Sequence, residues 1–164
     1  WIERMPRLMA VQASGSSAIY NAWASGAEVI TPVQAVTVAD SIAADLPRDG
    51  LRALRAIRAT GGAALQVSDA EILAAIPTLA RLTGVFAEPA GAAALAGLQK
   101  ALAASDAASQ LPKTGWQGTI AADAVVVLMI TGSGLKDIAS AMKASGPAPI
   151  IEPTLAAVKR ALAG

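Results

Sequence analysis

The sequence predicts an α/β fold, a three-layer sandwich with a mostly parallel sheet, because short apolar runs alternate with longer amphipathic stretches. The clearest run is 125–130, Val-Val-Val-Leu-Met-Ile, which is uncharged and is followed by Thr-Gly-Ser-Gly. Such runs are typical of strands buried on both faces. We therefore expect 125–130 to be a buried strand that brings Thr131 to the sheet edge where α/β proteins bind ligands.

The first strand–loop–helix unit occupies the N-terminal region. Residues 8–11 form a short apolar run, and a helical pattern with Ile19, Tyr20 and Trp23 ends before Gly26. Strand-like runs followed by helical periodicity indicate one such unit. The following segment, 27–48, has no regular pattern, and an edge strand near 35–38 is only weakly supported.

A second unit begins at Asp49 or Gly50 with an amphipathic helix that ends at Gly61-Gly62. Its three arginines, at 52, 55 and 58, form a separate stripe that is either a solvated face or an anion-binding patch. Residues 64–67 are predicted to be a short strand. The next helix begins with a capping box, in which Ser68 and Glu71 exchange hydrogen bonds.

The remaining helices differ in how much of their surface we expect to be buried. Residues 88–98 are apolar on every face, which indicates a helix buried nearly all round. After a polar loop at 105–119 and the 125–130 run, residues 135–144 are predicted to form a helix with Ile138, Ala141 and Met142 inward. Three prolines then mark a connector to a last helix capped by Thr154. We expect two parts, residues 1–146 and 147–164.

Composition excludes several classes of function. The chain has 164 residues, a formal charge of +1, and no cysteine or histidine. Thiol nucleophiles, imidazole acids and bases, and the usual zinc ligands are therefore absent, so no metal site is expected. The near-neutral charge gives no support to a nucleic-acid role. No apolar stretch reaches the roughly 20 residues of a membrane helix, so we expect a soluble, cytoplasmic protein.

Three places combine polar groups with a predicted sheet edge: Ser14–Ser17, Glu88 and Thr131–Gly134. The first is Gly/Ser-rich and offers backbone amides to an anion, or is a plain strand–helix connection. Glu88 either favours the positive end of a helix or belongs to a site. Ser133 in the third place can be an N-cap, so that segment is equally readable as a turn.

Four sequence blocks carry a resemblance to a known family. In chain order they are Ala39-Asp-Ser-Ile42, Val67-Ser-Asp-Ala-Glu-Ile72, Phe86-Ala-Glu-Pro-Ala-Gly-Ala-Ala93 and Thr131-Gly-Ser-Gly-Leu-Lys-Asp137. The chain resembles the C-terminal half of threonine synthase, a fold-type-II enzyme that uses pyridoxal phosphate. That resemblance implies part of a large domain like that of the tryptophan synthase β subunit. Ser133 departs from the histidine that the family commonly has there.

The resemblance implies a role for each matching residue. Thr131 would hydrogen-bond the pyridine nitrogen, which suits a neutral hydroxyl because a carboxylate would hold that nitrogen protonated. Glu88 would line the pocket near the ring, and Gly132 and Gly134 would let the backbone approach it. Lys136 belongs to this block, and we expect it to point away along a helix.

The family's Schiff-base lysine and its phosphate-binding loop lie upstream of the matching region. No catalytic residue is therefore expected in these 164 residues, which we expect to be inactive alone. The partners implied are the N-terminal half of the same enzyme, a small amino-acid substrate and, in the intact enzyme, a second subunit of a homodimer. Two alternatives stay open: another fold-type-II lyase, such as threonine dehydratase or a cysteine-synthase relative, and a non-catalytic binding or assembly module that keeps the fold.

Overall fold

The computed structural model describes residues 3, 5–105 and 119–163. Its sheet consists of two parallel strands, β1 (Met9–Ala13) and β2 (Ala63–Val67), paired in register from Met9 opposite Ala63 to Ala13 opposite Val67. All but one residue of β2 are buried, as expected of a parallel strand covered on both faces. The two strands predicted in the N-terminal half of the chain are therefore confirmed.

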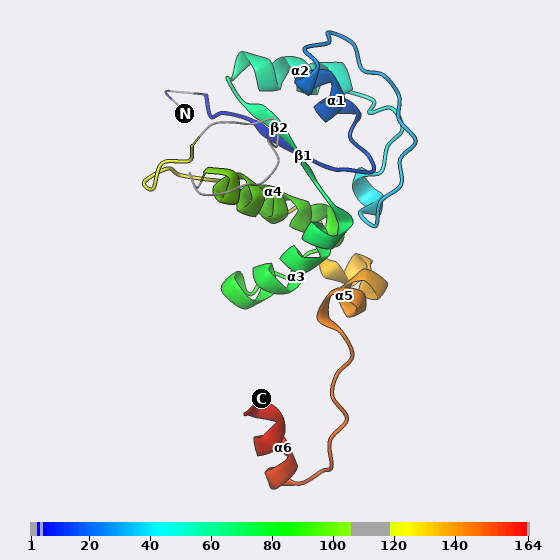
Figure 1. Ribbon diagram of the computed structural model, residues 1–164, viewed down its shortest axis with the longest axis vertical. Coiled ribbons are helices and arrows are strands. Elements are labelled where there is room, and N and C mark those ends of the chain that lie inside the picture. Colours follow the sequence, from blue (N-terminus) through cyan, green and yellow to red (C-terminus); the bar gives the residue numbers. More distant parts are fainter. Residues whose placement is uncertain (1–2, 4, 106–118, 164) are drawn as a thin grey trace.

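Helices cover both faces of this sheet, which confirms the three-layer α/β arrangement (Figure 1). Helices α1 (Ala18–Ala24) and α2 (Gly50–Ala59) lie on one side of the strands. On the other side, α4 (Pro89–Ser105) contacts both strands, and α3 (Asp69–Thr83) packs against α4. A β carbon at Gly97 of α4 would lie 2.3 Å from a methyl of Val11, so the glycine allows this close helix–sheet contact.

The hydrophobic core lies between the sheet and the α3–α4 pair. It is built mainly of alanine and branched aliphatic side chains, so the helices approach closely. The predicted capping box begins α3: Ser68 accepts from the backbone N–H of Glu71, and Glu71 accepts from that of Ser68. The buried core residues on these elements are Ala13, Val67, Ile72, Ala75, Ile76, Leu79, Ala92, Ala93 and Ala96.

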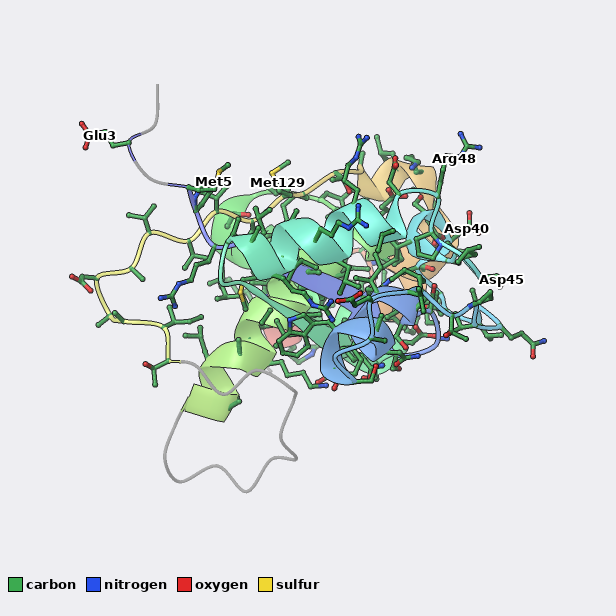
Figure 2. The ribbon with its side chains drawn as sticks, turned by 90° about the horizontal axis from the view of Figure 1, so that it is seen from above. Glu3, Met5, Asp40, Asp45, Arg48 and Met129 are labelled. Carbon is green, nitrogen blue, oxygen red and sulfur yellow. The ribbon has the colours of Figure 1, made fainter. Side chains whose placement is uncertain are left out.

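The prediction of a buried strand at 125–130 is wrong. The segment has no regular structure, and Val125, Val127 and Met129 are 93%, 77% and 71% exposed. Figure 2 shows the Met129 side chain projecting from the rim of the molecule. Among the described residues no strand pairs with this segment, and only Ile130 packs against the core. An extended chain without a hydrogen-bonding neighbour is not a strand, whatever its composition.

The helix predicted over 135–144 is confirmed from Ile138 onward, but its predicted start is wrong. The chain forms a 3-10 turn, η2 (Gly134–Lys136), and then α5 (Ile138–Ser145). Asp137 separates them because its carboxylate accepts from the N–H of Ser140 at 2.9 Å and so begins a new helix. Ile138 and Met142, expected to face inward, are 47% and 66% exposed.

Four further expectations concern the irregular segments and the C-terminal part of the chain. The edge strand near 35–38 does not form, although Val36 donates one backbone hydrogen bond to Gly15. Helix α6 (Leu155–Leu162) begins at Thr154 as predicted, lies apart from the three layers, and buries only Ala157 (Figure 1). The polar loop predicted at 105–119 falls almost entirely outside the described residues, and the division at 146/147 stays a prediction.

No helix within residues 3, 5–105 and 119–163 combines the length and the hydrophobicity needed to cross a lipid bilayer.

Candidate functional site

The candidate site forms where the Thr131 segment crosses the start of α4. The N–H of Glu88 donates to the carbonyl of Gly132 at 3.0 Å, and the N–H of Gly134 donates to the carbonyl of Phe86 at 2.9 Å. These bonds flank an isolated antiparallel bridge between Ala87 and Ser133. The structure therefore brings together all four predicted site residues, Glu88, Thr131, Gly132 and Gly134, although they come from blocks about 40 positions apart.

Glu88 is the buried charge of this site, with a residue exposure of 6%. Its Oε1 lies 3.0 Å from the Nζ of Lys136, and its Oε2 accepts from the hydroxyl of Ser41 at 3.4 Å. Lys136 also donates to the Ser41 hydroxyl at 3.3 Å, which closes a triangle of three side chains. The expectation that Lys136 points away along a helix is wrong: the 3-10 turn directs it back to Glu88, which satisfies a carboxylate that burial would otherwise penalise.

Packing within this chain requires glycine at positions 132 and 134, whether or not a ligand is bound. A β carbon at Gly132 would lie 1.8 Å from Oε1 of Glu88, and one at Gly134 would lie 2.3 Å from the ring of Phe86. Either contact is far inside van der Waals distance, so a larger residue would displace the carboxylate or the ring. These glycines were predicted to allow a close approach of the backbone to a ligand. The side chains of Glu88 and Phe86 already require glycine at both positions.

Thr131 stands at the open side of this turn. It is exposed, while its neighbour Ile130 packs against the core. Within the described part of the chain its hydroxyl makes no hydrogen bond. The hydroxyl of Thr131 is thus able to donate to a ligand atom such as a ring nitrogen, from a turn that two backbone hydrogen bonds hold to residues 86–88.

The second of the four sequence blocks, Val67–Ile72, reaches the site through Asp69, the first residue of α3. Its carboxylate accepts from the hydroxyl of Thr37 and, at 3.1 Å, from the N–H of Val38, and Thr37 in turn accepts from the N–H of Ala39. These hydrogen bonds, called the Asp69 clasp below, fix the chain immediately before Ser41. Ser41 itself lies on the short 3-10 helix η1 (Asp40–Ile42). In the view of Figure 2, Asp40 and Met5 lie on opposite sides of the molecule.

Ser41 and Lys136 were not predicted as site residues. Both lie inside blocks that resemble the family, so the signal was present, but nothing in their spacing links them. They are 95 positions apart in the chain and meet only because Glu88 lies between them.

The Ser14–Ser17 loop is a strand–helix connection in this structure. The N–H groups of Ser14 and Ser16 donate to Val67 and Ala13. The buried Ser16 hydroxyl donates to Ile42 and accepts from the N–H of Ala44. These backbone and side-chain groups serve the fold and leave little to offer an anion.

The arginine stripe of α2 also has a structural contact. Arg58 donates to the carbonyl oxygens of Ala22 and Ala27, at 3.3 and 2.8 Å. It thereby ties α2 to the end of α1, and all three arginines of the stripe are exposed.

Two carboxylates near the helix starts have displaced pKa values. Burial raises the pKa of Glu71, but hydrogen bonds from the backbone and hydroxyl of Ser68 and from Lys100 outweigh it, so the net pKa lies below the ordinary value. Hydrogen bonds from the side chain and backbone of Ser140 lower the pKa of Asp137. Both carboxylates therefore stay ionised at neutral pH and cap their helices.

Comparison with known proteins identifies the class. The family model described as pyridoxal-phosphate dependent enzyme matches residues 1–132, and the chain belongs to that family. Curated relatives are threonine synthases: those of Methanosarcina acetivorans and Methanocaldococcus jannaschii are 37% and 36% identical over 99% and 98% of this chain. The threonine synthase of Mycobacterium tuberculosis strain H37Rv is 37% identical over 87% of it.

These relatives are much longer than the chain. The matched regions are 37%, 37% and 34% of the three relatives named above. Among solved structures, that of maize serine racemase matches with a TM-score of 0.46 and 25% identity, over 56% of this chain and 27% of that one.

Proposed function

We propose that this chain forms one wall of the pyridoxal-phosphate site of an enzyme with threonine synthase activity, which converts O-phosphohomoserine and water to threonine and phosphate. The proposal rests chiefly on the free hydroxyl of Thr131, held by a turn that is hydrogen-bonded to the start of α4. The 34–37% identity to named threonine synthases supports the choice of reaction.

The residues present fit the cofactor. When bound, pyridoxal phosphate supplies an electron sink for replacement and elimination on an amino-acid side chain. Thr131 would donate to the ring nitrogen and, as a neutral donor, would leave that nitrogen unprotonated and so moderate the electron sink. Glu88 would lie near the ring, and the missing side chain at Gly132 leaves room for its carboxylate.

The rest of the site comes from outside these 164 residues. A Schiff-base lysine and a phosphate-binding loop, which the family carries in its N-terminal half, complete the pocket, and the chain alone is inactive. Its exposed apolar segment 125–129 is then covered by that half of the enzyme. The intact protein is a homodimer located in the cytoplasm, and its substrate is a small amino acid.

Replacing Thr131 tests this role. In the intact enzyme that contains this chain, Thr131→Val keeps the shape of the side chain and removes the donor, so we expect a loss of at least about tenfold in kcat/KM. Threonine and phosphate formation from O-phosphohomoserine measures it, together with the visible absorption of the bound cofactor.

Thr31→Val is the matched control, because it makes the same change at another exposed threonine that lies outside the turn. Equal activity and spectra for Thr131→Val and the parent enzyme would argue against the proposed contact. Formation of 2-oxobutanoate from threonine, with no turnover of O-phosphohomoserine, would favour the dehydratase alternative instead.

A further inference from the structure

We propose that Lys136 is a positioning residue, which holds the Glu88 carboxylate against Gly132 and so fixes the turn that presents Thr131. The inference rests on the proposed cofactor site and adds a residue to it. Its basis is the closed triangle of Lys136, Glu88 and Ser41, with polar contacts of 3.0, 3.3 and 3.4 Å.

The position of the carboxylate depends on Lys136. Oε1 of Glu88 is the atom that pairs with Nζ, and the same atom is the nearest neighbour of the space beside Gly132. No other lysine or arginine in the described ranges pairs with Glu88. A buried carboxylate that loses its cation is left with an uncompensated charge, so we expect Glu88 to move toward water in such a variant and to leave the contact with Gly132.

Lys136 also connects the turn to a second segment. The backbone bonds at Gly132 and Gly134 hold the turn to residues 86–88 alone. Among the described residues of the turn and of η2, Lys136 is the one whose side chain contacts Ser41, and the Asp69 clasp fixes Ser41 from the α3 side. Lys136 therefore joins the turn to the Ser41 segment, which also contacts Glu88 directly through the Ser41 hydroxyl.

The exposure of the pair separates this role from a contribution to core packing. The Lys136 side chain is 59% exposed and that of Glu88 is 7% exposed, so Lys136 approaches from solvent and fills no core volume. Lys136→Met keeps the aliphatic stem, and the variant should fold. The main consequence of Lys136→Met is that the Glu88 carboxylate becomes free to move, next to the proposed position of the cofactor ring.

The test is a double-mutant cycle of Lys136→Met and Glu88→Gln in the holoenzyme that contains this chain. Three quantities are measured: pyridoxal-phosphate affinity by titration, the absorption maximum of the bound cofactor, and the Tm of the cofactor-free protein. We expect Lys136→Met to weaken cofactor binding roughly tenfold, the size of one hydrogen bond to a charged group, and to shift the absorption maximum. The double variant should bind no worse than the weaker single one.

Two further variants serve as controls. Lys136→Arg keeps the cation and should restore most of the affinity, whereas Lys143→Met, an exposed lysine of α5, should leave all three quantities unchanged. If Lys136→Met fails to fold, Lys136→Gln removes the charge but keeps a hydrogen-bond donor, and Ser41→Ala removes the two hydroxyl contacts of the triangle but keeps the ion pair.

The outcomes separate the two proposals. Normal affinity and absorption in Lys136→Met or Lys136→Gln, with at most a lower Tm, would mean a structural ion pair and would overturn this inference while leaving the proposed function intact. A parent enzyme that binds no pyridoxal phosphate would overturn both.

Discussion

Two segments of similar composition behave in opposite ways in this molecule. Residues 63–67 are a short apolar run followed by Ser68 and a helix, and they form β2, with four of five residues buried. Residues 125–130 are a longer and more β-branched run followed by Thr131, yet they remain irregular and largely exposed. By intrinsic preference alone, the second segment is the better strand.

The difference is the presence of neighbours. β2 pairs along its whole length with β1, and helices contact it from both sides. The 125–130 segment contacts the core through Ile130 only, at the point where it enters the turn. Strand formation therefore depends on a partner and on cover for the side chains, which a local pattern does not report.

Leu65→Ala should give the largest effect among changes that probe this contrast. Leu65 lies in β2 with 1% exposure, so truncation leaves a cavity and should lower the free energy of unfolding by about 2–5 kcal/mol. Urea unfolding of the chain measures it. Leu82→Ala, the same change at a position that is 77% exposed, should stay within about 0.5 kcal/mol. Similar losses at both positions would contradict the assignment of β2 to the core.

The predictable parts of the fold are those set by short-range chemistry. The capping box of Ser68 and Glu71, the N-cap at Thr154 and the stop of α2 at Gly61 depend on residues within four positions, and the structure reproduces them. The break in the chain before α5 also has a local cause, because Asp137 is a good N-cap. The sequence was nevertheless predicted to form one longer helix because its apolar stripe continues across Asp137. Ile138 is 47% exposed while Ala144 packs against the core, so the apolar stripe is covered only at the C-terminal end of α5.

The candidate site also contains features that the sequence could predict and features that it could not. The hydrogen bonds between residues 86–88 and 132–134 could not be derived from spacing, and their proximity was expected only from the resemblance. Lys136 and Ser41 lay within the resembling blocks, but the link between them requires three segments to meet in space. A buried carboxylate such as Glu88 signals that a cation must lie near it, without saying which one.

Glu71→Gln should have an intermediate and pH-dependent effect on the well-packed region. Because the folded-state pKa of Glu71 is depressed, its contribution is present above the unfolded-state pKa of about 4.3 and is lost as pH falls through the lower folded value. We expect the variant to be less stable by about 1 kcal/mol near pH 7, the usual size of a helix cap, and to approach the parent near pH 3.

Urea unfolding at several pH values measures that difference. Lys100→Met is the matched comparison, because Lys100 donates to the same carboxylate at 3.1 Å. Lys100→Met should lower the free energy of unfolding less than Glu71→Gln does, because the contacts between Ser68 and Glu71 remain. A difference between parent and Glu71→Gln that does not change with pH would show that the carboxylate charge plays no part.

Val127→Ser should have the smallest effect, and it tests the contrast most directly. Val127 is 77% exposed, so in the chain alone the substitution should change the free energy of unfolding by less than about 0.5 kcal/mol. In the intact enzyme, cover by the remaining part of the protein would turn 125–130 into a packed strand, and the same substitution should then cost about 1–3 kcal/mol. Glu152→Ser, at an exposed position in the connector, should be neutral in both. If Val127→Ser changes the free energy of unfolding of the intact enzyme by less than about 0.5 kcal/mol, residues 125–130 remain exposed there. Their apolar side chains would then have a role other than completing the sheet.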